Sequence, residues 1–333
     1  MFLNSSDPSE CYFNRLPAPI TWCITSGGAG HEAQCLGVCD ALHITPVIKR
    51  VNPKGVYKLL APIGPAMANQ TIMPPWPDLL IVSGRQSLPY ARGIKRHSKG
   101  KTFVAVLQKP GLPSSWFDFI WVPACDHLIG DNVFTTLMAP HRLSEGKLLE
   151  AQRQFQSLIS TLPKPIVTVL IGGPSRSFDF GLKEASQLAR DLVQLHQATG
   201  CSFLISYSYR TPSPFKQIFS QALFSLPVHI WDGEMPNPYL GYLSLANYFI
   251  VTSDSINMLG EAAYTGKPIY AYPIPFRHKK FKQYYAQLIQ LDVIRWYDGS
   301  LNYWSYSALD ATKKIAQALY IRLAAHQQAR EIF

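Results

Sequence analysis

The feature that most constrains this chain is a strand, a glycine-rich turn and a helix in direct succession, a unit that occurs twice. In ITWCITSGGAGHEAQCLGVCDAL an apolar run ends at Gly27–Gly30, and apolar residues at helical spacing follow it. IVTVLIGGPSRSF repeats the strand and the turn at Gly172 and Gly173. Units of this kind build doubly wound parallel sheets, whose ligands bind beyond the carboxyl ends of the strands.

Apolar runs of strand length alternate with helical periodicity along the rest of the chain. The 333 residues correspond to about two domains of ordinary size, and the prolines of TLPKP predict a linker between them. We therefore expect an α/β protein with two Rossmann-like domains, residues 1–162 and 163–333, facing each other across a cleft. The last helix has the length and position to pack back on the first domain.

Composition excludes several classes of protein. Hydrophobic residues make up 47% of the chain, which argues against wholesale disorder, and no apolar run approaches the ~20 residues that span a bilayer. The first residues lack the basic start and apolar core of a secretion signal, so we expect a cytoplasmic protein. The six cysteines form no CxxC pair, and Cys35 and Cys39 are expected to be buried thiols.

The first glycine-rich turn matches the loose pattern GxGxxA at Gly28 and Gly30, which suits a phosphate held by main-chain amides. A dinucleotide site would place an acid about 20 residues later, where this chain has Lys49 and Arg50. This disfavours NAD and leaves NADP open. His31, at the start of the helix, is a candidate neutral base or a residue that merely packs the turn.

The segment IVTSDSINMLGEAAYTGKPIYAY is the strongest local motif. Ser253, Asp254 and Ser255 precede a helix whose free amides suit a diphosphate, and Glu261 lies where it could accept from both hydroxyls of a ribose. The alternative is an ordinary helix cap with a solvated glutamate.

Two further turns belong to the second domain. Gly172 and Gly173 form a loop with Arg176 close behind, and Ser206 and Arg210 end another strand. Together these turns could bracket a pyrophosphate, and ordinary turn chemistry explains each of them alone.

The net charge of +10 favours anionic partners. Two basic clusters, Arg92–Lys101 and Arg277–Lys282, stand beside aromatic residues that we expect to be exposed, among them Tyr284 and Tyr285. Such clusters suit an anionic membrane surface. We expect no nucleic-acid partner, because no groove-reading or single-strand module accompanies them.

Several ordered motifs resemble the Elm family, whose plant members are named for elongated mitochondria and mitochondrial fission. They include SGGAGHEAQCLGV, SGRQSLPYARGIKR, LIGGPSRSF, ISYSYRTP and NPYLGYLSLANYFIVTSDSINMLGEAAYTGKPIY. The resemblance covers nearly all of the chain after residue 20. That family in turn resembles the GT-B glycosyltransferases, particularly the lipid-linked sugar transferases of the cell envelope.

The resemblance implies a nucleotide-sugar site in the second domain and an acceptor site in the first. The residues it assigns to the substrates are Gly28, Gly30, Gly172, Gly173, Ser206, Arg210, Ser253, Asp254, Ser255 and Glu261. Where the family pattern has an acid before the first glycines and a Glu-His-Asp run, this chain has Ser26 and Ala124-Cys125-Asp126, which leaves His31 and Asp126 as candidate bases.

We therefore expect a metal-independent glycosyltransferase without a cofactor, peripheral on the inner membrane. It would use a nucleotide-diphosphate sugar and an envelope lipid or polysaccharide acceptor. Two alternatives stay open: a non-catalytic adaptor that recruits a membrane or fission-type partner, and an NADP-dependent nucleotide-sugar epimerase or reductase.

Overall fold

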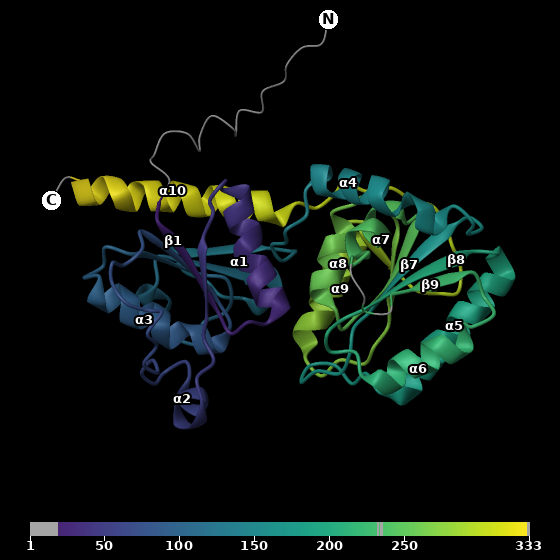
Figure 1. The fold of residues 1–333 in the computed structure, drawn as a ribbon, viewed down its shortest axis with the longest axis horizontal. Coiled ribbons are helices and arrows are strands. Elements are labelled where there is room, and N and C mark those ends of the chain that lie inside the picture. Colours follow the sequence, from purple (N-terminus) through teal and green to yellow (C-terminus); the bar gives the residue numbers. More distant parts are fainter. Residues whose placement is uncertain (1–18, 232, 234–235, 332–333) are drawn as a thin grey trace, which may run out of the picture. The chain divides into compact units, whose positions relative to one another are not determined.

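The structure is a computed structural model that describes residues 19–231, 233 and 236–331 (Figure 1). The N-terminal segment, from which we expect no secretion signal, and Cys11 within it lie outside the described residues. The described chain divides into two compact units: unit 1 holds residues 19–142 and 310–331, and unit 2 holds residues 143–309.

Unit 1 contains a six-stranded parallel sheet in the order β2-β1-β3-β4-β5-β6. Its strands are β1 (Thr21–Thr25), β2 (Val47–Arg50), β3 (Leu79–Ser83), β4 (Phe103–Val106), β5 (Phe119–Pro123) and β6 (Val133–Thr136). Its helices are α1 (Ala29–Ala41), α2 (Gly55–Leu60), α3 (Leu88–His97) and α10 (Ala311–Glu331), with short 3-10 turns at Arg85–Ser87, Ser114–Trp116 and Ala124–Asp126. β1, β3 and β4 are buried along their whole length, as continuous apolar strands of a parallel sheet covered on both faces must be.

α10 comes from the far end of the chain and contacts α1, β4, β5 and β6. The main-chain amide of His141 donates to Thr312 Oγ1 at 2.9 Å, which joins the start of α10 to the end of the first segment of unit 1. The division after Arg142 falls before the boundary at 162/163 that the prolines predict, because α4 (Glu145–Phe155) packs on α7 (Tyr239–Leu245) of unit 2.

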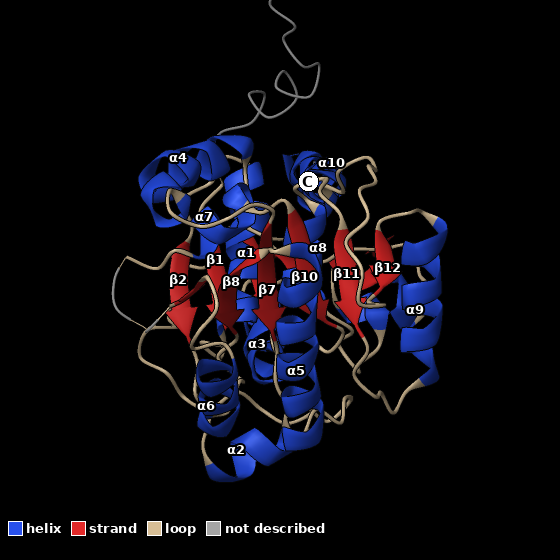
Figure 2. Cartoon of the chain, turned by 90° about the vertical axis from the view of Figure 1, so that its right-hand side faces the viewer, coloured by secondary structure: helices blue, strands red, loops and turns tan. Residues whose placement is uncertain are grey.

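Unit 2 contains a second six-stranded parallel sheet, in the order β12-β11-β10-β7-β8-β9. Figure 2 labels its strands β8, β7, β10, β11 and β12. Its strands are β7 (Ile166–Ile171), β8 (Ser202–Tyr207), β9 (Val228–Ile230), β10 (Tyr248–Thr252), β11 (Ile269–Tyr272) and β12 (Ile294–Trp296). Besides α4 and α7, its helices are α5 (Leu182–Thr199), α6 (Ser213–Ala222), α8 (Ile256–Ala263) and α9 (Lys279–Gln290), with a 3-10 turn at Gln156–Ile159.

The two sheets confirm the predicted α/β class and the two Rossmann-like units. In each sheet the chain reverses the direction in which it adds strands: between β1 and β3 in unit 1, and between β7 and β10 in unit 2. At such a switch point the loops leave opposite faces of the sheet and open a crevice at the carboxyl ends of the strands. Both glycine-rich turns follow a strand that borders a switch point.

The predicted burial of the cysteines is confirmed for the described part of the chain. Cys35 and Cys39 are free thiols in the core of unit 1, and Cys23 Sγ lies 3.6 Å from Cys39 Sγ.

Candidate functional site

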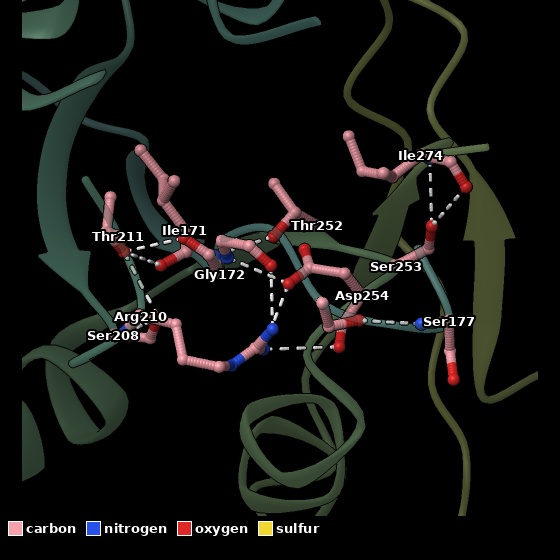
Figure 3. A network of polar contacts seen from close by, with 12 residues as sticks. Ile171, Gly172, Ser177, Ser208, Arg210, Thr211, Thr252, Ser253, Asp254 and Ile274 are labelled. Carbon is pink, nitrogen blue, oxygen red and sulfur yellow. Dashed lines mark hydrogen bonds and ion pairs between the residues drawn. The ribbon is translucent and has the colours of Figure 1, made fainter. Parts of the chain in front are cut away.

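The loops after β7 and β10 meet at the switch point of unit 2 (Figure 3). The amide of Gly172 donates to Thr252 Oγ1 at 2.8 Å, and the amide of Gly173 donates to Asp254 Oδ2 at 2.8 Å. A Cβ on Gly172 would lie 2.1 Å from Asp254 Oδ2, and one on Gly173 would lie 2.4 Å from the carbonyl oxygen of Arg210. Glycine is required at both positions because the loops approach so closely.

Asp254 and Arg210 form the centre of this network. Arg210 Nη2 lies 3.0 Å from Asp254 Oδ2, and Arg210 Nη1 donates to the carbonyl oxygen of Gly173 at 2.6 Å. The Asp254 side chain is completely buried, and burial raises its pKa against the opposing effects of the Gly173 amide and Arg210. The Arg210 guanidinium therefore binds other loops of the protein. It joins the loop after β8 to the loops after β7 and β10.

The remaining predicted hydroxyls of this region are also engaged or buried. Ser253 Oγ accepts from the amide of Ile274 at 2.9 Å (Figure 3), and Ser206 is buried in β8. Thr211 was not among the predicted site residues; its Oγ1 lies 3.0 and 2.6 Å from the carbonyl oxygens of Ile171 and Gly172, either of which can accept its one hydroxyl proton.

The start of α8 differs from these loops because its amides are open. Ser255 occupies the N-cap position, yet its side chain makes no capping bond. Within the described residues, no protein acceptor is recorded for the amides of Ile256, Asn257 and Met258. Asn257 and Arg176 are both exposed. A helix start with three free amides and no cap is an anion-binding arrangement.

Glu261 lies two turns into α8 and has a partner that the sequence did not predict. The Tyr239 hydroxyl of α7 donates to Glu261 Oε2. Burial raises the pKa of Glu261 to about 7, an effect that the hydrogen bond from Tyr239 opposes. Burial, together with the nearby Glu261 carboxylate, raises the pKa of Tyr239 as well.

Unit 1 has a second polar group of residues at its own switch point. His31, in the first turn of α1, places Nδ1 2.8 Å from Ser83 Oγ at the end of β3. Ser83 Oγ in turn donates to Leu107 O at 3.3 Å or Gln34 Oε1 at 3.2 Å. When the hydroxyl proton of Ser83 points to either of those acceptors, its oxygen can accept from His31 Nδ1–H, and in that tautomer Nε2 is the basic nitrogen. Desolvation by the surrounding protein lowers the pKa of His31.

The glycine-rich turn before His31 is looser than the one in unit 2. Gly28 is the N-cap of α1 with φ −67°, and a Cβ there would meet only His31 Cδ2, at 3.4 Å. Gly30 lies within the first turn of α1. Gly27, with φ +80°, is the residue of this turn whose backbone favours glycine.

Asp126 lies in the 3-10 turn that follows β5. His31 contacts Ser83 at the end of β3, and β4 lies between β3 and β5 in the sheet, so the two candidate bases follow different strands. Arg50, which favoured NADP, forms an ion pair of 2.7 Å with Glu32.

The expectation of exposed aromatic residues in the second basic cluster is wrong. Tyr284 and Tyr285 are buried, because they lie on the face of α9 that packs on unit 2. Arg277 of that cluster forms an ion pair with Asp179. Together with Phe281 and Leu288 they follow the i, i+3, i+4, i+7 spacing of a buried helix face, which the charged neighbours obscured.

Comparison with known proteins decides the family. Residues 29–323 match the model of the family described as mitochondrial fission ELM1. The chain belongs to this family. It is 29% identical over 286 residues to the mitochondrial fission protein ELM1 of Arabidopsis thaliana, covering 78% of this chain and 67% of that protein. It is 28% identical over 286 residues to the uncharacterized protein RP120 of Rickettsia prowazekii, covering 74% and 80%.

A solved structure shares the fold. UDP-GlcNAc 2-epimerase from Neisseria meningitidis, bound to UDP-GlcNAc, aligns with a TM-score of 0.51 at 12% identity over 93% of this ELM1-family chain and 99% of the enzyme. The ELM1-family chain thus has the fold of GT-B enzymes. No helix among its described residues is both long enough and apolar enough to cross a membrane.

Proposed function

We propose that unit 2 binds the diphosphate of a nucleotide sugar at the start of α8 and that this ELM1-family protein transfers the sugar to an acceptor. The observation that carries the proposal is the uncapped start of α8, with the free amides of Ile256, Asn257 and Met258, beside the switch point of the sheet. The shared fold of an epimerase whose structure holds UDP-GlcNAc supports the same class of ligand.

In this proposal the residues of the network have different tasks. The rim of the site is formed by Gly172, Gly173, Ser206 and Arg210, and Asp254 holds these loops together. The ligand itself is bound by main-chain amides and by Arg176. These donors balance the charge of the leaving diphosphate without a metal ion or a cofactor. Glu261 would meet the ribose with the carboxyl group that Tyr239 also contacts.

The transfer step assigns the base to His31. The proton of the acceptor hydroxyl passes to His31 Nε2 as the acceptor oxygen bonds to the anomeric carbon, and the bond from that carbon to the diphosphate oxygen breaks. A lowered pKa keeps the imidazole neutral at pH 7, which this step requires. Asp126 is the second candidate base. The acceptor class is an envelope lipid or glycan, and the protein would work at a membrane surface.

Calorimetry with UDP, GDP, CMP and NADP tests the proposal on the wild type and on Asn257→Asp. A carboxylate in the first turn favours the helix itself but repels an anionic ligand. We expect a nucleoside diphosphate to bind the wild type and to bind Asn257→Asp about tenfold or more weakly. Asn257→Ala, which adds no charge, is the matched control and should bind nearly as the wild type does.

The other outcomes identify the alternatives. Binding of NADP without a nucleoside diphosphate would favour the oxidoreductase. If no nucleotide binds, the result would favour the non-catalytic adaptor over the transferase. Conversion of a nucleotide sugar to its epimer, with no transfer to an added acceptor, would support the proposed nucleotide-sugar site and replace the proposed transfer with an epimerisation.

A further inference from the structure

The excess of positive over negative charge in this protein is concentrated in one part of unit 1. Residues 45–117 hold eleven of the chain's 31 Lys and Arg residues and only one of its 21 Asp and Glu residues, Asp78. The rest of the chain holds twenty of each sign. The net charge of +10 therefore belongs to this segment, which contains α2 and α3.

α2 lies in this segment and exposes its apolar side chains. None of its residues is buried, and Leu59 is 77% exposed, as is 72% of Ile63 just after the helix. Val56 and Leu60 are also exposed. A contiguous set of apolar side chains on a soluble surface costs free energy unless a partner covers it.

Hydrogen bonds from arginines connect the end of α2 to α3 and to the turn before α3. Arg92 Nη1 donates to the carbonyl oxygens of Pro62 and Ile63 at 3.0 and 2.6 Å, and Arg85 Nη2 donates to Leu59 O at 3.4 Å. Figure 1 shows α2 standing apart from the sheet of unit 1. The helix is thus anchored at its carbonyl end while its apolar side chains remain open.

A hollow of about 820 Å³ separates the chain after α2 from α3. It is lined by Ile63–Ala66 on the α2 side, by Arg92, Lys95, Arg96, His97 and Lys99 of the α3 region, and by Trp116. Arg96 and Lys99 are exposed, and among the described residues neither the Arg96 guanidinium nor the Lys99 ammonium has a hydrogen-bond or ion-pair partner. The Arg92 guanidinium lies 4.8 Å from the centre of the Trp116 ring.

We propose that α2 and α3 together form a docking surface for an anionic phospholipid bilayer. Val56, Leu59, Leu60 and Ile63 enter the boundary of the acyl chains, and Arg96 and Lys99 hold lipid phosphates at the mouth of the hollow. A second copy of the chain does not suit this surface, because two such segments repel one another. A nucleic acid would use the cations and leave the apolar side chains of α2 exposed to water.

Sedimentation with vesicles tests the surface, using phosphatidylcholine alone and an equimolar mixture with phosphatidylglycerol. We expect the wild type to bind the mixed vesicles and not the neutral ones. Arg96→Gln/Lys99→Gln should weaken binding about 30-fold, since each cation near an anionic surface contributes about fivefold. Leu59→Ser/Leu60→Ser should weaken it about tenfold or more.

Two control variants lie outside the surface. Lys279→Gln/Lys282→Gln removes two exposed cations of α9, and Phe224→Ser removes a side chain that is 88% exposed in unit 2. Both should bind mixed vesicles as the wild type does. All of the altered side chains are exposed, so circular dichroism should show folded protein in each case.

Three results would overturn the inference. They are no binding of the wild type to mixed vesicles, a loss of vesicle binding by the α9 control equal to that of Arg96→Gln/Lys99→Gln, and self-association of the protein through the apolar side chains of α2. Retention of vesicle binding by Leu59→Ser/Leu60→Ser would also exclude an apolar contribution. The assay contains no nucleotide, so its result is independent of the proposed transfer reaction.

Discussion

The glycine-rich turns after β1 and β7 look alike in the sequence but are built differently. In unit 2 the loops are so close that Gly172 and Gly173 have no room for a Cβ, and the buried Asp254 carboxylate joins them to Arg210. In unit 1 the turn is open: the Gly27 amide donates to Thr25 Oγ1 at 3.1 Å, and His31 contacts Ser83. A rigid rim suits the binding of a fixed charged group, while an open turn with a neutral imidazole suits contact with a reacting group.

Alanine substitutions of one glycine in each turn provide the strongest test of this difference. Gly173→Ala should lower the free energy of unfolding by about 3 kcal/mol or more, because the new Cβ would lie 2.4 Å from a main-chain oxygen that cannot rotate away. Gly28→Ala should cost less than about 1 kcal/mol, since φ is −67° and the nearest contact is a ring edge at 3.4 Å. Urea unfolding followed by tryptophan fluorescence measures both, and equal costs would remove the contrast.

Breaking the ion pair of unit 2 should have an effect nearly as large. Asp254→Ala leaves Arg210 without its buried carboxylate partner and should cost about 3 kcal/mol of stability. Arg210→Ala leaves the buried carboxylate instead and should cost a similar amount. Because both variants lose the same interaction, the double variant should cost clearly less than the sum of the two. Strict additivity in a thermodynamic cycle would show that the pair does not lock the loops.

The Tyr239–Glu261 pair predicts a pH dependence of stability. The folded state holds the Glu261 proton up to about pH 7, whereas the unfolded state loses it near the ordinary value of 4.5. Stability from this group is therefore highest below pH 4.5 and falls as the pH rises toward 7. Glu261→Gln cannot ionise and keeps an acceptor for Tyr239, so it should be on the order of 2 kcal/mol more stable than the wild type at pH 8.

Thermal unfolding at pH 5 and pH 8 separates this effect from a general change in packing. The advantage of Glu261→Gln should appear at pH 8 and largely vanish at pH 5. An equal difference at both values would mean that ionisation of Glu261 is not its cause.

The smallest predicted effect concerns His31. Its lowered pKa means that His31 is protonated less readily in the folded than in the unfolded state. Its contribution to the free energy of unfolding is therefore present above about pH 6.5 and declines as the pH falls below that value. The change should be below about 1 kcal/mol. Nitrogen NMR should show a neutral ring with the proton on Nδ1 and titration below 6.5, and Ser83→Ala should remove the preference for that tautomer. A ring that titrates at 6.5 or above would contradict the neutral base.

Local sequence pattern predicted much of the fold. The apolar runs at 21–25, 79–83, 166–171 and 248–252 are strands because a buried parallel strand needs apolar side chains on both faces. The short strands β6 and β12 and the helix α2 were not predicted. VFTT and IRW are brief and partly polar, and α2 lacks the buried stripe on which helical periodicity depends.

The candidate site was predicted only in part, for a related reason. Glycines, hydroxyls and cations at strand ends can be read directly from the sequence, and they led to Gly172, Asp254 and Arg210. Their partners could not be found in this way. The contacts from Tyr239 to Glu261 and from Ser83 to His31 join residues 22 and 52 positions apart.

The amino-acid sequence by itself determined the alternation of strands and helices, the two glycine-rich turns and the concentration of net positive charge in residues 45–117. These properties depend on neighbouring residues and on composition. Tertiary structure decided which strands lie next to one another, that Arg210 is committed to Asp254, that Tyr284 and Tyr285 are buried, and that α2 exposes its apolar side chains. Those outcomes depend on pairing and packing between distant segments, whose free energy no local pattern records.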